Sequence, residues 1–319
     1  MAGNQAVEIN PANLGIGITD HGSDWFWTVF SIFGLNSLIH AGFYIIYNRS
    51  KNSDSKYKSL AHVAPLGISA ILAYTYYTLA SNLGWTGVET EFNHIEIDDN
   101  VRQIFYARYI GWFLSFPLLF YQFEFNLLSQ NILTSADFFQ IFNKLFLTIA
   151  STEVFVLGLL IGSLIKSTYK WGYWTFGVSA QIFTIIVFTT KQFNSNNGSK
   201  SLLSKLLIPF FIIVYILYPV NWGLSEGGNV IQPDSEGVFY GVLDLVLFWL
   251  TPYALIFDSR KNGLFVDSNN LPNTNNGNND LEKQVETPEL RASGETEVNP
   301  TEDQDAGQLE TQRPANTNA

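Results

Sequence analysis

The chain has 319 residues, of which 47% are hydrophobic and only 14% are charged. A soluble domain carries about 25% charged residues, so this composition excludes an ordinary water-soluble enzyme. Cysteine is absent, which excludes disulfides, thiolate metal sites and cysteine nucleophiles. The net charge of −11 argues against nucleic acid as a partner, because phosphate backbones bind basic surfaces.

The acidic charge is concentrated at the C-terminal end of the chain. Residues 262–319 contain eleven Asp and Glu against three Lys and Arg, which leaves a net charge of −8 on this segment. The segment is also rich in Asn, Thr, Gly and Pro. It cannot bury enough apolar surface to offset the entropy lost on ordering. We therefore predict a disordered acidic tail over residues 262–319.

The rest of the chain alternates between long apolar runs and short polar segments. A helix needs roughly 20 apolar residues to cross a bilayer core. Seven runs meet this length: 24–47, 59–82, 104–127, 141–164, 171–190, 203–222 and 237–257. The sequence thus predicts an all-α membrane protein, with a short N-terminal segment (1–22) and a seven-helix domain (23–261). The lipid bilayer is the partner implied by this pattern.

The basic residues indicate the orientation of the bundle. Arg49, Lys51, Lys56 and Lys58 lie between the first two spans, and loops rich in Lys and Arg stay in the cytosol. The loops after spans two and six are mainly acidic. We expect the N-terminus outside and the tail in the cytosol.

A few ionisable side chains lie inside the predicted spans, where a charge is costly and usually marks a partner or a function. Arg108 in span three and Asp244 in span seven lie at comparable depth. They predict either a salt bridge that locks the two helices or an ion or ligand site. Glu153 in span four faces a polar cavity or bonds a neighbouring helix, and His40 in span one is interpreted as a packing residue.

Prolines inside the spans suggest kinks that open space within the bundle. They are Pro65, Pro117, Pro209, Pro219 and Pro252. Trp112, Trp174, Tyr218 and Trp222 are candidates to line an interior pocket. The alternative for each aromatic is plain packing or a place in the interfacial belt.

Three motifs resemble the microbial opsins, in the expected spans and order. Span three contains FYARYIGWFLSFPLLFYQ, span six ends in YPVNWGLSEGG, and span seven contains VLDLVLF. The strings SNLGWTGVETEFNH, GSLIKSTYKWGYWTFG and GGNVIQPDSEGVFYGVLDL resemble more narrowly the fungal opsin-related heat-shock proteins. That resemblance implies a stress-induced plasma-membrane protein, associated with restraint of the plasma-membrane proton ATPase and with membrane stress tolerance.

The same resemblance implies that the light cycle is lost. The opsin lysine that binds retinal lies one turn after the span-seven aspartate, where this chain has Phe248. The proton-acceptor position is Gly111 and the proton-donor position is Gln122, while Glu226 matches the outer acid of the proton-release group. The positions that still match the retinal pocket are Arg108, Trp112, Ser115, Pro117, Trp174, Tyr218, Pro219, Trp222 and Asp244. We expect no covalent retinal and no metal site.

Two functions remain open from the sequence. The first is a non-enzymatic, non-photoactive regulator of the proton ATPase or of membrane stress tolerance. The second is an ion or small-molecule pathway, or a receptor, that uses the vacant pocket. A light-driven pump is disfavoured by Phe248. An enzyme is not expected, because no nucleophile–base pair or phosphate-binding loop is visible.

Overall fold

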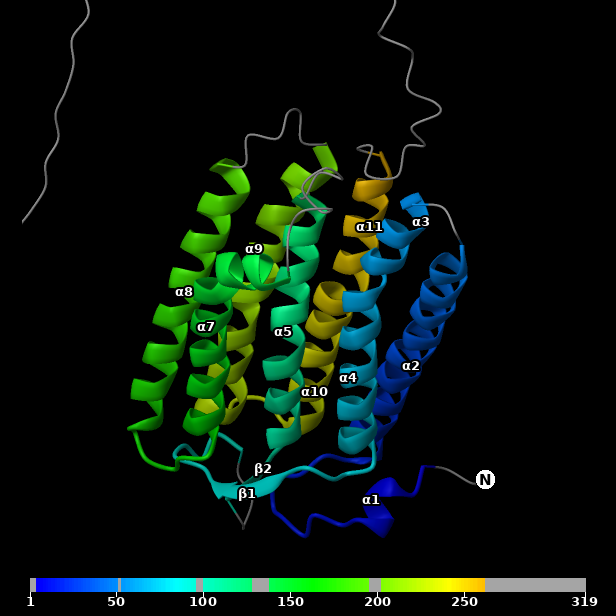
Figure 1. Cartoon of the computed structure of the whole chain (residues 1–319). Coiled ribbons are helices and arrows are strands. Elements are labelled where there is room, and N and C mark those ends of the chain that lie inside the picture. Colours follow the sequence, from blue (N-terminus) through cyan, green and yellow to red (C-terminus); the bar gives the residue numbers. More distant parts are fainter. Residues whose placement is uncertain (1–3, 51–52, 96–99, 128–137, 195–201, 262–319) are drawn as a thin grey trace, which may run out of the picture. The chain divides into compact units, whose positions relative to one another are not determined.

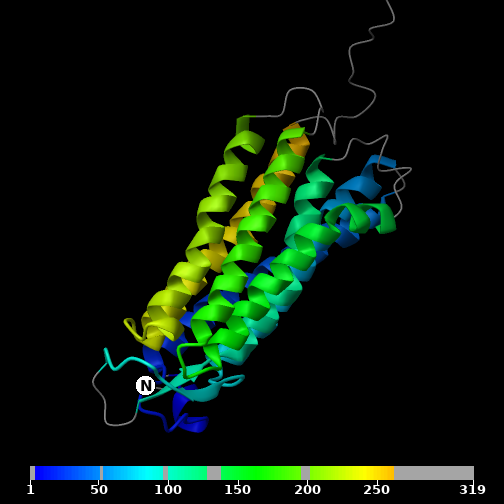
Figure 2. The same cartoon turned by 90° about the vertical axis from the view of Figure 1, so that its left-hand side faces the viewer.

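A computed structural model describes residues 4–50, 53–95, 100–127, 138–194 and 202–261. The predicted tail, 262–319, lies outside the described residues. Figure 1 shows a bundle of long helices that run side by side, and Figure 2 shows the same arrangement from a perpendicular direction. The prediction of an all-α bundle is confirmed.

Seven helical rods match the seven predicted spans within a few residues. Six are α2 (Asp20–Arg49), α4 (Val63–Ala80), α5 (Tyr106–Leu127), α7 (Phe138–Ser163), α8 (Lys170–Asn194) and α9 (Leu202–Trp222). The seventh is continuous but composite: α10 (Pro233–Asp244), the π-helical segment η2 (Leu245–Leu250) and α11 (Thr251–Lys261). A short helix, α3 (Ser53–Ala61), precedes α4 and is separated from it by His62.

Six of the described helical stretches are long and apolar enough to cross a membrane, and α5 is not among them. Helix α5 has the length but carries the polar residues Arg108, Gln122 and Glu124. It nevertheless packs between α4 and α7. Neighbouring helices cover Arg108 and Gln122, which are both buried, so these polar side chains are tolerated in the interior.

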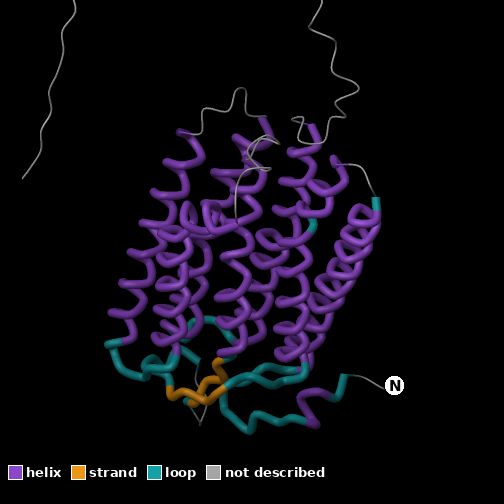
Figure 3. Tube along the Cα trace, in the orientation of Figure 1, coloured by secondary structure: helices purple, strands orange, loops and turns teal. Residues whose placement is uncertain are grey.

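Among the described residues, the strands and most of the loops lie at one end of the bundle, which we call the hairpin end (Figure 3). Strands β1 (Thr86–Glu89) and β2 (Val101–Ile104) pair antiparallel there, with Thr86 opposite Ile104. The short helix α1 (Ala6–Ile9) lies at the same end, and Ile16 forms an isolated parallel bridge with Arg102. Part of the predicted acidic loop after span two is thus an ordered hairpin.

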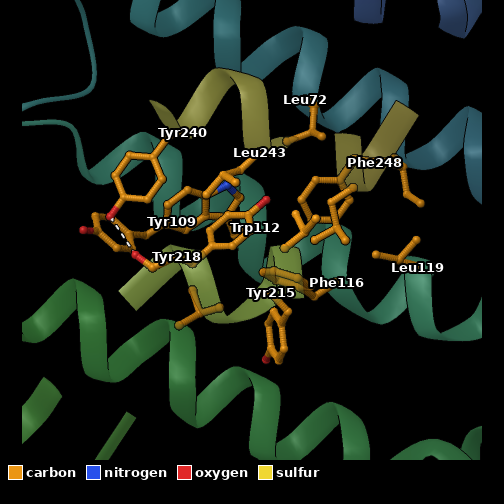
Figure 4. Packing of buried hydrophobic residues seen from close by; sticks show 14 of the residues in the cluster. Leu72, Tyr109, Trp112, Phe116, Leu119, Tyr215, Tyr218, Tyr240, Leu243 and Phe248 are labelled. Atoms are coloured by element: carbon orange, nitrogen blue, oxygen red, sulfur yellow. Dashed lines mark hydrogen bonds between the residues drawn. The ribbon is translucent and has the colours of Figure 1, made fainter. Parts of the chain in front are cut away.

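The centre of the bundle is filled by aromatic side chains (Figure 4). The rings of Trp112 and Tyr218 lie 5.0 Å apart between centroids, and so do those of Phe116 and Phe248. All four side chains are buried. Edge-to-face pairs of this kind are favourable beyond the area they bury. The prolines predicted an interior pocket, but at Phe248 the interior is occupied by packed rings.

Helices α7 and α8 approach closely at two glycines. A Cβ atom added to Gly158 would lie 2.9 Å from the Cα atom of Gly177 and 2.9 Å from the carbonyl oxygen of Tyr173. Real Cβ atoms essentially never come this near to backbone atoms. Small residues permit this approach where lipid offers no hydrophobic drive for helices to associate.

We predict that Gly158→Ala destabilises the bundle by about 1–3 kcal/mol, because the added methyl group forces α7 away from α8. Gly34→Ala in α2 is the matched control, since a Cβ atom there meets nothing within 4 Å. The measurement is the thermal unfolding midpoint of the detergent-solubilised protein. Equal midpoints for the two variants would contradict the close approach.

Candidate functional site

Asp244 lies at the end of α10, and three side chains from other helices donate hydrogen bonds to its carboxylate. The hydroxyl of Tyr76 in α4 lies 2.5 Å from Oδ2, and the hydroxyl of Tyr218 in α9 lies 2.7 Å from Oδ1. The indole Nε1 of Trp112 in α5 lies 2.9 Å from Oδ1. Asp244 is buried. Neutral donors therefore surround both oxygens of this carboxylate.

The predicted salt bridge between Arg108 and Asp244 is wrong. Arg108 instead forms a buried ion pair with Glu236, and its Nη1 lies 3.9 Å from Oε1 of Glu226. The guanidinium also lies over the ring of Tyr240, 4.6 Å from its centroid. The comparable depth of Arg108 and Asp244 along their helices did not reveal which way each side chain points.

Glu236 is a central residue of this site that the sequence analysis did not single out. It was assigned to the loop after span six, but α10 begins at Pro233 and Glu236 is buried. Its Oε2 also pairs with Nη2 of Arg102 at 2.7 Å, so two guanidinium groups meet one carboxylate. The signal was present in the sequence: proline is favoured in the first turn of a helix, and acidic residues are enriched there. Glu236, Tyr240 and Asp244 follow at intervals of four, which places them on one helix face.

Glu226 lies in the π-helical segment η1 (Gly223–Gly227), which continues α9. The hydroxyl of Tyr109 in α5 donates to its Oε2 at 2.5 Å. The side chain is buried. The structure thus brings Glu226, the predicted outer acid, beside Arg108. The sequence analysis ended span six at residue 222, whereas the helix continues for another turn and carries Glu226.

This interior holds two guanidiniums, Arg102 and Arg108, and three carboxylates, Glu226, Glu236 and Asp244. Both guanidiniums pair with Glu236. Asp244 has no ion pair among the described residues, and the Tyr and Trp donors take the place of a cation around it. Hydrogen bonds to an ionised group are stronger than those between neutral groups.

The lysine position of the opsins carries no amine. The Phe248 side chain is fully buried against Phe116, so its place is a packed hydrocarbon contact. Gly111 faces α4: a Cβ atom added there would lie 2.5 Å from Oγ1 of Thr75. A carboxylate at Gly111 therefore requires movement of Thr75. The residues present do not fit a covalently bound retinal.

The remaining predicted pocket residues do not converge on Asp244. The indole of Trp174 donates to the carbonyl oxygen of Pro219 at 3.1 Å, and that of Trp222 to the carbonyl oxygen of Leu159 at 3.0 Å. These bonds tie α8 and α7 to α9. Pro117 lines a cavity of about 380 Å³ between α4, α5 and α7, whose other lining side chains are mainly apolar.

Four other polar residues of the spans make no hydrogen bond to Asp244 or to its three donors. Ser115 and Gln122 are buried, and neither side chain has a hydrogen-bond partner among the described residues. Both carboxylate oxygens of Glu153 also lack one, so of its two predicted alternatives the bond to a neighbouring helix is not formed. His40 is buried as predicted, with its Nδ1 2.8 Å from Nδ1 of His62. Within the described ranges, no group of three or more His, Asp and Glu is arranged to hold a metal ion.

We predict that Glu236→Gln destabilises the protein by about 3–5 kcal/mol, because a neutral amide leaves two buried guanidiniums without their carboxylate. Glu226→Gln is the matched variant, and its loss is smaller. The nearest guanidinium nitrogen is 3.9 Å from Glu226, and an amide oxygen can still accept from Tyr109. Thermal unfolding midpoints of the two purified variants test this order. A larger loss for Glu226→Gln would contradict the assignment of Glu236 as the central acid.

Comparison with known sequences identifies the family of this chain. The family described as bacteriorhodopsin-like protein matches residues 24–247. The 30 kDa heat shock protein of Saccharomyces cerevisiae is 40% identical over 81% of this chain and 79% of its own length. The protein MRH1 of the same yeast is 36% identical over 80% and 77%. The opsin-like protein carO of Fusarium fujikuroi is 36% identical over 76% of each chain.

Solved structures share the fold. Acetabularia rhodopsin I superposes with a TM-score of 0.64 at 22% identity, over 78% of this chain and 97% of its own. A light-driven proton pump from Leptosphaeria maculans gives 0.63 at 23% identity, over 77% and 99%. The chloride pump halorhodopsin gives 0.63 at 16% identity, over 77% and 98%. At these identities the likeness establishes the architecture alone.

Proposed function

The chain belongs to the bacteriorhodopsin-like family of multi-pass membrane proteins, and we propose that it is a non-photoactive member that serves the stress response of the plasma membrane. In this role it regulates the plasma-membrane proton ATPase or membrane stress tolerance, and it is not an enzyme. The observation that carries the proposal is the replacement of the retinal lysine by Phe248, buried against Phe116. The name of its relative in yeast, a heat shock protein, supports the stress role.

A role exerted through contacts with other membrane proteins is favoured over a pathway through the bundle. Trp112, Phe116, Tyr218 and Phe248 fill the centre with ring contacts, and the carboxylate of Asp244 is fully engaged by donors. An ion or small molecule that used this region would have to displace packed rings. The second candidate, a ligand or ion pathway, therefore predicts that function depends on Asp244, whereas a contact-based regulator does not.

For the topology, we propose that the hairpin end faces the outside and that the C-terminal end of the bundle faces the cytosol. The support is the excess of Lys and Arg in the segment that follows α2 and the acidic character of the hairpin end. A protease-accessible tag after Ala319 should be protected in intact spheroplasts, while a tag before Met1 should be cleaved. The reverse pattern of cleavage would refute this orientation.

We expect the purified protein mixed with all-trans retinal to show no red-shifted visible band, because a Schiff base needs an amine and Phe248 has none. Phe248→Lys supplies the amine but must displace the ring packed on Phe116, so we expect only weak binding. The combination with Gly111→Asp should also require Thr75→Ala, which removes the crowding oxygen. Borohydride trapping of retinal on the unmodified protein would contradict the proposal.

The regulatory role predicts a phenotype. After heat or weak-acid stress, cells that lack the protein should acidify the medium faster on addition of glucose than cells that have it, because the proton ATPase is no longer restrained. Complementation with Asp244→Asn should restore the restraint if the role is contact-based, provided that surface expression is unchanged. Equal acidification by cells with and without the protein would argue against regulation of the proton ATPase.

A further inference from the structure

A second site lies at the hairpin end, apart from the buried carboxylates. A cavity of about 570 Å³ opens between α1 and the adjoining ends of α2 and α4. Its walls include Asp24 and Trp27 of α2, Tyr77 and Ser81 at the end of α4, and Asn4 and Asn10 beside α1. No lining residue is a lysine or arginine. We call this cavity the Asp24 pocket.

The Asp24 pocket combines one acid with two aromatic rings. Asp24 and Trp27 are three residues apart on α2, so their side chains lie on the same face of the helix. The ring planes of Trp27 and Tyr77 are nearly perpendicular, at 84°, and their centroids lie 5.6 Å apart. Asp24 is exposed and has no ion-pair partner among the described residues. An aromatic face with an unpaired carboxylate beside it attracts a cation.

Four polar atoms of Asn4 and Asn10 in the wall already have hydrogen-bond partners. Nδ2 of Asn10 donates to the carbonyl oxygen of Ser81 at 2.9 Å, and Nδ2 of Asn4 donates to Oγ of Ser23 at 2.6 Å. Oδ1 of Asn4 accepts from the backbone N–H of Ala6 at 3.0 Å, and the carbonyl oxygen of Asn10 accepts from Asn82 at 2.7 Å. A primary ammonium donates three hydrogen bonds, whereas a quaternary ammonium donates none and is held by aromatic faces and a counter-charge.

We propose that the Asp24 pocket binds a quaternary ammonium group, with Asp24 supplying the counter-charge and Trp27 and Tyr77 the aromatic faces. Such a group is the headgroup of phosphatidylcholine or a free choline-like solute. Trp and Tyr side chains at the end of a membrane helix lie at headgroup level, so both sources reach the pocket. This site is independent of the proposed stress function.

The test measures binding of radiolabelled choline to the full chain by equilibrium dialysis in a maltoside detergent, which has no choline headgroup. We expect saturable binding with one choline per chain. Asp24→Asn, which keeps the shape, and Trp27→Leu, which removes a ring, should each weaken it by about tenfold or more. Asp20→Asn and Tyr74→Leu alter the same two helices outside the pocket and should bind like the unmodified protein.

The source of the group is distinguished in nanodiscs of phosphatidylcholine and of phosphatidylethanolamine, which have the same net charge. If the lipid headgroup occupies the pocket, choline binding should be at least about tenfold weaker in phosphatidylcholine discs. Equal binding in both discs assigns the site to a free solute. If Trp27→Leu fails to fold, Asp24→Asn decides. Absence of saturable choline binding, or equal affinity of Asp24→Asn and the unmodified protein, overturns the proposal.

Discussion

The bundle depends on one buried carboxylate that pairs with two guanidiniums. Glu236 of α10 meets Arg108 of α5 and Arg102 of strand β2, and all three side chains are buried. A charge buried in a membrane protein without its partner is strongly unfavourable, so these segments have to assemble together. Arg102 also donates to Oδ1 of Asn229 at 2.8 Å and to the carbonyl oxygen of Ile231 at 2.8 Å. The hairpin is therefore part of the fold rather than a loop laid over it.

A second constraint on the bundle is the buried carboxylate of Asp244, which has no ion pair among the described residues. Tyr76, Trp112 and Tyr218 give it three neutral donors, and with Phe248 in the lysine position the surrounding space is filled by rings. The Asp244 carboxylate is thus a hydrogen-bonded junction of α4, α5, α9 and α10. These three bonds help to hold the four helices in register.

The sequence predicted the bundle well because each span is a long apolar run. The match of Phe248 to the position of the opsin lysine stays a prediction, made from the fixed interval that the opsin resemblance places after Asp244. The sequence analysis failed where the outcome depends on which way a side chain points around its helix axis. Arg108 and Asp244 share a depth but not a facing direction, and only packing determines which acid Arg108 meets. Glu236 was assigned to a loop because a charge beside acidic neighbours resembles solvent-exposed sequence. Tyr76 and Tyr109 passed unnoticed, since a tyrosine in a span gives no sign of whether its hydroxyl has an acceptor.

The hairpin end also carries ion pairs that are less deeply buried than those of Glu236. Glu89 pairs with Lys166, and Glu91 lies 3.3 Å from Nζ of Lys170. Partial burial acts to raise the pKa of Glu91, but the hydrogen bond from Thr168 and the nearby ammonium of Lys170 outweigh it, and the pKa lies below its ordinary value. A carboxylate with a lowered pKa stabilises the fold above the pKa of its unfolded state, and that stabilisation is lost as the pH falls through the folded value. The ion pair between Glu91 and Lys170, the first residue of α8, is therefore expected to weaken as the pH falls. Asp24 has no such partner among the described residues and lines an open pocket, so its charge is available to a ligand.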